Sequence, residues 1–245
     1  MKFRFFLAAP IAFLPLAPSL AAEPNNSDTD RLKERIIAHA RTVTAEDHAY
    51  TRTVRTEATE GTGSDKKEES VIVDRWDPAK PLDQRWTFVS IDGKPPDADQ
   101  LKIYRQAVEK RRQTYYGRVA GYFGKPATSS VDMRGRTIFR FASLPKETVM
   151  VNDSDISANA TGEVVVDTTG ATPFIEEVRF TSTKPTRVKL IAKIDRFETM
   201  TRYRLMPDGK PVPIESSSDM TGSMLGKQGR IHTRIAYTDH RAVGK

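Results

Sequence analysis

The sequence has no cysteine and only four histidines among its 245 residues. Without cysteine, the chain cannot form a disulfide, a thiolate metal site or a cysteine nucleophile. The histidines occupy positions 39, 48, 232 and 240, and none forms an H-x-x-x-H pair or has a carboxylate nearby at a metal-site spacing. We therefore expect no metal site and no cofactor.

Recognisable catalytic motifs are also absent. The sequence contains no P-loop and no G-x-G-x-x-G, and the serines at 216–218 lie in an expected strand rather than in a G-x-S-x-G elbow. Glu176 and Glu177 are neighbours on an expected strand, where successive side chains point to opposite faces, so they cannot form a catalytic dyad. We predict a protein that is not an enzyme, although catalysis by residues distant in the sequence is left open.

Long hydrophobic runs are missing except at the N-terminus. Lys2 and Arg4 precede an apolar segment from Phe5 to Leu20, which three prolines interrupt. A transmembrane helix needs about 20 predominantly apolar residues, and proline breaks helices. The segment is instead typical of a secretory signal peptide, with small residues placed for cleavage after Ala21 or Ala22.

This assignment sets the expected domain organisation and location. Residues 1–21 form the signal peptide, and residues 22–245 form a single domain, because no long linker divides them. With no cysteine near the cleavage site, the mature N-terminus cannot carry a lipid. We therefore predict a soluble, periplasmic protein.

The charge is mildly basic. The net charge of +7 falls to +5 once Lys2 and Arg4 are removed. In an exported protein, nucleic acid is not an expected partner. Anionic lipid headgroups or other envelope polyanions are the expected partners of the excess positive charge. The alternative is that this charge only keeps the protein soluble.

The hydrophobic pattern predicts an α+β fold dominated by antiparallel strands. Apolar residues at helical spacing predict an amphipathic helix over 28–43, and a capping-box pattern at Asp97 and Gln100 predicts a second helix from Ala98. The remaining β-rich runs between turn residues are typical of a meander of about 9–11 strands. The expected strands cover residues 48–56, 70–76, 85–91, 131–142, 149–151, 162–167, 174–180, two strands within 187–205, 212–221 and 230–237, with a mobile hairpin loop over 57–69.

The expected strand over 187–194 shows the clearest alternation. Its apolar residues at 188, 190, 192 and 194 are expected to be buried, and its lysines at 189 and 193 to face solvent. The apolar parity shifts after Ile194. This shift predicts a turn or bulge near Asp195 and Arg196.

The basic helix expected over 98–113 has two interpretations. It could lie on a membrane surface, or it could pack on the sheet through Leu101, Tyr104 and Val108 with its cations in solvent. We favour packing, because the apolar face lacks the Trp, Phe and Leu density of interfacial helices. We expect at most a peripheral contact with membranes.

Three C-terminal segments resemble a known family. They are 162–170 (GEVVVDTTG), 208–213 (DGKPVP) and 237–241 (YTDHR). Together with the order of signal peptide, helix, strands, helix and meander, they are similar to the closing part of the LolA/LolB-like outer-membrane lipoprotein-sorting superfamily. The resemblance rests on motifs in this C-terminal part and on element order in the first half.

The resemblance implies an open antiparallel β half-barrel with helices covering its concave face. In relatives the apolar interior holds acyl chains, which implies a carrier or binder of a lipid or an acylated protein. The same fold serves in envelope-stress regulators. The alternative is therefore an interaction module that binds a partner protein of the cell envelope.

The candidate ligand-binding residues are those on the more apolar side of the expected strands. Removing acyl CH₂ groups from water contributes about 0.8 kcal/mol each, so such a site needs no charged anchor. A collapsed, dry core is the competing interpretation, and it predicts no ligand. The candidate lining residues are Phe139, Phe141, Phe174, Val178, Phe180, Leu190, Ile194 and Met220.

Overall fold

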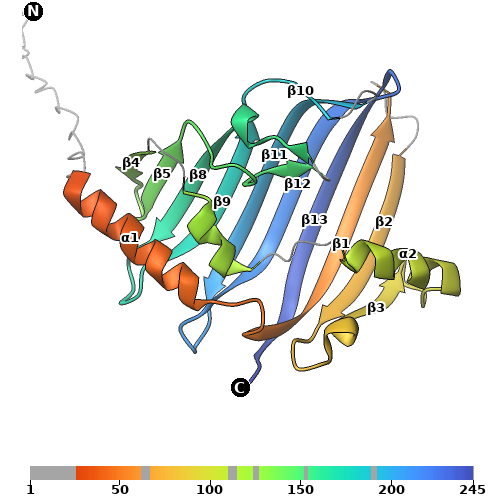
Figure 1. The fold of residues 1–245 in the computed structure, drawn as a ribbon, viewed down its shortest axis with the longest axis horizontal. Helices are drawn as coiled ribbons and strands as arrows, with labels where there is room; N and C mark the ends of the chain where they lie inside the picture. The colour runs from red at the N-terminus through yellow and green to blue at the C-terminus, as the bar shows by residue number, and fades with distance from the viewer. Residues whose placement is uncertain are drawn as a thin grey trace, which may run out of the picture.

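The computed structural model describes residues 26–61, 67–109, 115–123, 127–151, 154–188 and 192–244. Strands dominate these residues (Figure 1). The main strands are β1 (His48–Glu60), β2 (Lys67–Trp76), β3 (Trp86–Ile91), β4 (Ala127–Val131), β5 (Thr137–Phe141), β8 (Ala160–Asp167), β9 (Phe174–Ser182), β10 (Thr186–Arg187), β11 (Ala192–Leu205), β12 (Pro211–Met224) and β13 (Lys227–Ala242). The other elements are α1 (Asn26–Thr42), α2 (Ala98–Glu109), η1 (Leu82–Gln84), η2 (Tyr116–Gly121), η3 (Ser157–Asn159), β6 (Met150–Val151) and β7 (Ser154–Asp155).

The main strands form one antiparallel sheet that does not close on itself. Its strand order is β3-β2-β1-β13-β12-β11-β9-β8-β5-β4, with β10 paired to β11, and it counts 11 strands. Strands β6 and β7 form a separate small sheet. The predicted α+β class, with an open antiparallel half-barrel, is confirmed.

The helices lie on one face of the sheet because of how its edges are connected. Strands β3 and β4 are opposite edges, and the chain between them carries α2 and η2 across one face (Figure 1). Helix α1 packs on η2 on the same side. We call this the inner face; it carries Phe139, Phe180 and Tyr203, and the opposite side is the outer face.

The start of α2 matches its sequence signal. The backbone N–H of Gln100 donates to Asp97 Oδ1 at 2.8 Å, and the backbone N–H of Asp97 donates to Gln100 Oε1 at 2.9 Å. This reciprocal arrangement is the predicted capping box, and it satisfies two backbone donors at the helix start.

The centre of the sheet joins the first and last strands of the chain. Strand β1 pairs with β13 over their full length, from His48 opposite Ala242 to Glu60 opposite Gly229. No local sequence signal predicts this pairing, because it joins residues far apart in the chain.

Two predicted elements within residues 57–142 differ from the structure. The loop expected over 57–69 is shorter, because β1 runs to Glu60 and β2 begins at Lys67; residues 62–66 lie outside the described residues. Lys67 pairs with Glu57 across the hairpin at 2.9 Å, which favours the extended ladder over a loop. The strand expected over 131–142 is instead a hairpin of β4 and β5, turned by Asp132, whose carboxylate accepts the N–H groups of Arg134 and Arg136.

The strand expected over 187–194 is a further correction. The chain reverses inside it, so that Arg187 lies opposite Lys193 and Thr186 opposite Ile194. Val188 and Ile194 are buried and Lys193 is exposed, as predicted, whereas Ala192 is only partly buried. Lys189 and Leu190 lie outside the described residues. The predicted irregularity after Ile194 is confirmed by a register shift between Ile194 and Arg196.

Two tight turns share a left-handed backbone. Asp92 and Gly93 have φ values of 49° and 76°, and Leu225 and Gly226 have φ values of 52° and 79°. Each pair forms a two-residue turn, flanked by the partners Ile91 and Lys94 in the first case and by the β12–β13 ladder in the second. Such turns favour Asn-Gly and Asp-Gly, because both central residues need positive φ.

Candidate functional site

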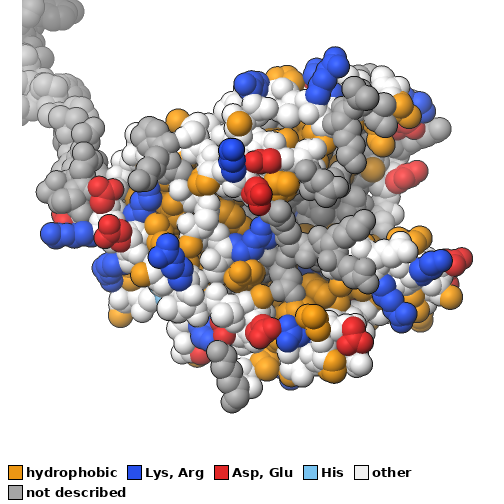
Figure 2. Space-filling view, in the orientation of Figure 1, with side chains coloured by type: hydrophobic (Ala, Val, Ile, Leu, Met, Phe, Trp, Pro, Cys, Tyr) orange, Lys and Arg blue, Asp and Glu red, His pale blue; other side chains and the backbone are white. Residues whose placement is uncertain are grey.

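The inner face carries three regions that differ in how they are covered. One end, under α1 and η2, holds a large buried cluster; the other, under α2, holds a smaller aromatic cluster. Between them, side chains from β11, β12, β13, β1 and β2 remain partly exposed. Figure 2 shows hydrophobic side chains reaching the surface of this face beside α2.

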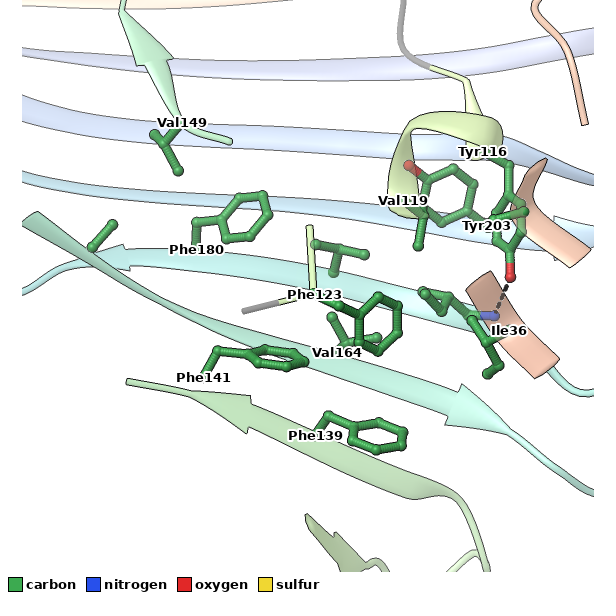
Figure 3. Close-up of a cluster of buried hydrophobic side chains, with 14 of the residues drawn as sticks. Ile36, Tyr116, Val119, Phe123, Phe139, Phe141, Val149, Val164, Phe180 and Tyr203 are labelled. Atoms are coloured by element: carbon green, nitrogen blue, oxygen red, sulfur yellow. Dashed lines mark hydrogen bonds between the residues drawn. The ribbon is translucent and has the colours of Figure 1, made fainter. Parts of the chain in front are cut away.

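The large cluster contains the predicted phenylalanines. Phe139 and Phe141 are 0% and 1% exposed, and the ring of Phe123 packs edge-on against both, with centroids 5.8 Å and 5.4 Å away (Figure 3). The ammonium of Lys33 lies 5.7 Å from the centroids of Phe123 and Phe141. Side chains from η2 and the segment after it thus fill the space over β5.

Seven of the eight predicted lining residues belong to this region. Val178, Phe180 and Ile194 are buried in the same cluster as the two phenylalanines, and Phe174 and Met220 pack against it partly buried. Leu190 lies outside the described residues. The structure brings these residues together; that they line a ligand cavity stays a prediction.

The floor of this cluster has low polarity. The hydroxyl of Tyr116 accepts the backbone N–H of Ile175 at 2.8 Å, and burial raises the pKa of Tyr116 to about 12. Burial also raises the pKa of Tyr203 well above its ordinary value. Both phenols are therefore neutral at physiological pH.

The second cluster is built around a buried ion pair. Asp74, which is 0% exposed, accepts hydrogen bonds from Arg52 Nε at 2.9 Å and Arg52 Nη2 at 2.6 Å. The Tyr104 hydroxyl of α2 donates to the same carboxylate at 2.9 Å, and its ring stacks on Phe88. The predicted packing of α2 on the sheet is thereby observed, and Tyr104 is the side chain that anchors it.

The ion pair with Asp74 keeps Arg52 protonated inside the fold. Burial disfavours the Arg52 guanidinium, but its hydrogen bonds and attraction to Asp74 outweigh this, so the pKa of Arg52 rises above its ordinary value. The guanidinium also lies 4.9 Å from the ring centroid of Trp86. This charged group is therefore engaged inside the fold and structural in role.

Between the two clusters lies a region that we call the central strip. It consists of two adjacent rows of cross-strand neighbours on the inner face. The first row is Thr201, Ser216, Ile235, Val54 and Ile72, and the second is Thr199, Ser218, Thr233, Thr56 and Ser70. All ten side chains are partly exposed, and none is charged.

The central strip continues from the predicted lining residues. Val178 on β9 lies opposite Thr201, and Phe180 lies opposite Thr199, so each row adjoins a buried apolar residue of the large cluster. The hydroxyls of Thr201 and Ser216 are 3.0 Å apart, and those of Thr56 and Thr233 are 3.4 Å apart. The strip can therefore accept an apolar group without stranding these hydroxyls.

Sequence reasoning missed the central strip. Val54 is flanked by Thr53 and Arg55, and Ile235 by Arg234 and Ala236, which marks one less polar side per strand but does not show that the two strands are neighbours. The only available signal was this alternation, and the long-range β1–β13 pairing was needed to join the two sides into one surface.

The described ranges of the chain also bear on metal sites and on membrane-spanning helices. Within those ranges, no group of three or more His, Asp or Glu side chains is arranged to hold a metal ion. None of the described helices combines the length and the apolar character needed to cross a membrane.

Comparison with known proteins gives a likeness in structure but no match in sequence. No family model matches the sequence, and no curated protein matches it. A crystal structure of a LolA superfamily protein from Nitrosomonas europaea is similar, with a TM-score of 0.33 and 10% sequence identity over 88% of this chain and 94% of that chain. The similarity is to a protein of the superfamily that the sequence resembles, and at this level it carries no inference about function.

Proposed function

We propose that the protein is a non-enzymatic carrier that binds an acyl chain of a lipid or of a lipidated protein along the central strip. The observation that carries this proposal is a pair of uncharged, partly exposed rows that continue from a buried apolar cluster on the inner face of an open sheet. The bound group is held by removal of apolar surface from water rather than by a charged anchor.

The dimensions of the strip suit an acyl chain. The rows cross five strands from β11 to β2, and at about 4.8 Å between strands they are roughly 19 Å long. A bilayer core about 30 Å thick is filled by two leaflets, so one acyl chain covers roughly 15 Å. A chain of this length fits within the strip, and each CH₂ that it buries contributes about 0.8 kcal/mol.

Titration of delipidated, folded protein with a fluorescent fatty acid tests the proposal. Ile235→Asn places an amide in the strip, and we expect roughly tenfold or greater weakening, as for the loss of a buried aliphatic side chain. Ala236→Asn is the matched control, because Ala236 is exposed on the outer face one residue along the same strand. Absence of saturable binding in the wild type, or equal effects of the two variants, would contradict the proposal.

The predicted phenylalanine cluster can be tested in the same titration. If the bound chain also enters between Phe123 and Phe141, Phe180→Asp should abolish binding. If the cluster stays closed, Ile235→Asn should weaken probe binding and Phe180→Asp should not. Circular dichroism must show that each variant is folded, because Phe180 is 9% exposed.

A second function is an envelope interaction module that binds a partner protein. The hydroxyls of the strip favour this reading, since they can hydrogen-bond a polypeptide as an acyl chain cannot. Native mass spectrometry of protein purified from the periplasm distinguishes the two: a copurifying acyl lipid supports the carrier, whereas a bound protein without lipid supports the module.

A mature N-terminus at Ala22 or Glu23 in this material would support the proposed periplasmic location; retained Met1 would refute it.

A further inference from the structure

The turn between β12 and β13 exposes two large apolar side chains at its tip. Met224 is 60% exposed and Leu225 is 72% exposed. The turn lies at the upper end of the long central strands, away from α1 and α2 (Figure 1). Adjacent exposed hydrophobic side chains at the extremity of a fold are placed to contact something outside it.

The backbone conformation at this tip makes the choice of leucine informative. Leu225 has φ 52°, and Asp92 has φ 49° in the equivalent place of the Asp92-Gly93 turn. Asp and Asn tolerate this left-handed conformation, whereas leucine is strained in it. The chain thus has a favoured residue, Asp92, at one turn and an unfavoured apolar residue, Leu225, at the other. A strained residue that is kept at an exposed position suggests that its side chain has a function.

Cations lie near the tip, among carboxylates. Arg187, Lys193, Arg196 and Lys227 are at this end of the sheet. Lys193 pairs with Asp195 and Lys227 with Glu60, and Arg196 lies 3.8 Å from Glu198. Figure 2 shows Lys and Arg side chains along the same upper edge. Lys227 and Arg196 are 74% and 72% exposed, and exposed ion pairs such as Lys227 with Glu60 are weak enough for an external anion to compete.

We propose that this tip is a docking finger for an anionic lipid surface. Met224 and Leu225 enter the interface of the bilayer, while the flanking cations meet the negative headgroups. A pair of apolar side chains among cations is the chemistry that such a surface recognises. The proposal concerns a site separate from the central strip and does not depend on acyl binding there.

This assignment places membrane contact at a different element from the basic helix considered in the sequence. The apolar side of α2 is occupied by packing of Tyr104 on Phe88, which leaves Ile103 as the large exposed apolar side chain of that helix. A single exposed isoleucine is an ordinary surface feature. The tip, by contrast, combines two adjacent apolar side chains, strain and neighbouring cations.

Flotation of the full chain with vesicles tests the proposal. The wild type should float with vesicles of phosphatidylcholine mixed with phosphatidylglycerol, less with phosphatidylcholine alone, and less at high salt. Leu225→Asn should weaken partitioning roughly tenfold, in line with loss of one buried leucine. The same change should leave the melting temperature equal or higher, because Asn-Gly suits the turn.

The control and the related variants make the outcome decisive. Leu82→Asn removes a leucine that is 80% exposed in η1, and it should float as the wild type does. Ile235→Asn should keep vesicle binding, and Leu225→Asn should keep fatty-acid binding, so this proposal and the proposed carrier function fail independently. A wild type that does not float, which is expected if a protein covers the tip instead, would overturn the proposal. Full binding by Leu225→Asn, or equal losses with Leu82→Asn, would also overturn it.

Discussion

Replacing Arg52 with methionine should destabilise the fold far more than an ordinary loss of one surface charge. The change removes both guanidinium hydrogen bonds, at 2.9 Å and 2.6 Å, from a carboxylate that is 0% exposed. Breaking a buried ion pair by removing one partner costs about 3–5 kcal/mol, because the remaining charge stays buried without its counter-charge. We expect Arg52→Met to lower the free energy of unfolding by that amount.

Two further variants show which interactions account for this loss in the free energy of unfolding. Tyr104→Phe removes one hydrogen bond to the charged Asp74 and should cost about 1.5–3 kcal/mol. The double variant Arg52→Met with Asp74→Leu removes both charges together, and it should recover most of the stability that Arg52→Met loses. Recovery in the double variant separates the penalty of a stranded carboxylate from simple loss of packing.

Urea unfolding followed by circular dichroism measures these differences, provided that the denaturant slope stays constant among the variants. Arg241→Met is the matched control, because Arg241 pairs with Asp77 at 2.7 Å while its side chain is 65% exposed. Exposed pairs contribute less than about 1 kcal/mol. Equal destabilisation by Arg52→Met and Arg241→Met would refute the reasoning.

Two other predictions follow from single residues. Phe139→Ala should cost about 3–5 kcal/mol in urea unfolding because the ring is fully buried, whereas Ile138→Ala, which is half-buried on the outer face, should cost clearly less; similar losses would contradict the assigned faces. Burial raises the pKa of Asp47, but hydrogen bonds from Lys210 and Thr44 outweigh it and hold the pKa below its usual value. This carboxylate therefore stabilises the fold above about pH 4, and the advantage of the wild type over Asp47→Asn should shrink as the pH falls below that value; a constant advantage would argue against the ion pair.

Local signals predicted local structure well. The capping box at Asp97 and Gln100 started α2 at the expected residue, and the Asp208-Gly209 turn joined two strands as expected. The parity shift after Ile194 marked a real irregularity in β11. In each case the cause lies within a few neighbouring residues, which is why the sequence displays it.

Signals of alternation misled where a turn had no glycine or proline to mark it. The run from Arg187 to Ile194 alternates like a strand, yet the chain reverses inside it, so that Arg187 lies opposite Lys193. The candidate site was predicted in part for a related reason. The phenylalanines on β5 and β9 predicted an apolar cluster from the sequence alone. The small hydroxyl side chains of the central strip form one surface only because β1 and β13 pair, and the sequence does not show that pairing.

The position of β13 has a consequence for the order in which the molecule can fold. The last strand of the sequence lies in the middle of the sheet, between β1 and β12. Until it arrives, the chain consists of two half-sheets with open edges of 13 and 14 residues, and long unpaired edges invite pairing with other molecules. Non-local strand pairing is also slow to form. Newly synthesised molecules are therefore expected to be most prone to aggregation just before their final strand is inserted, and this is the stage at which a chaperone would protect them.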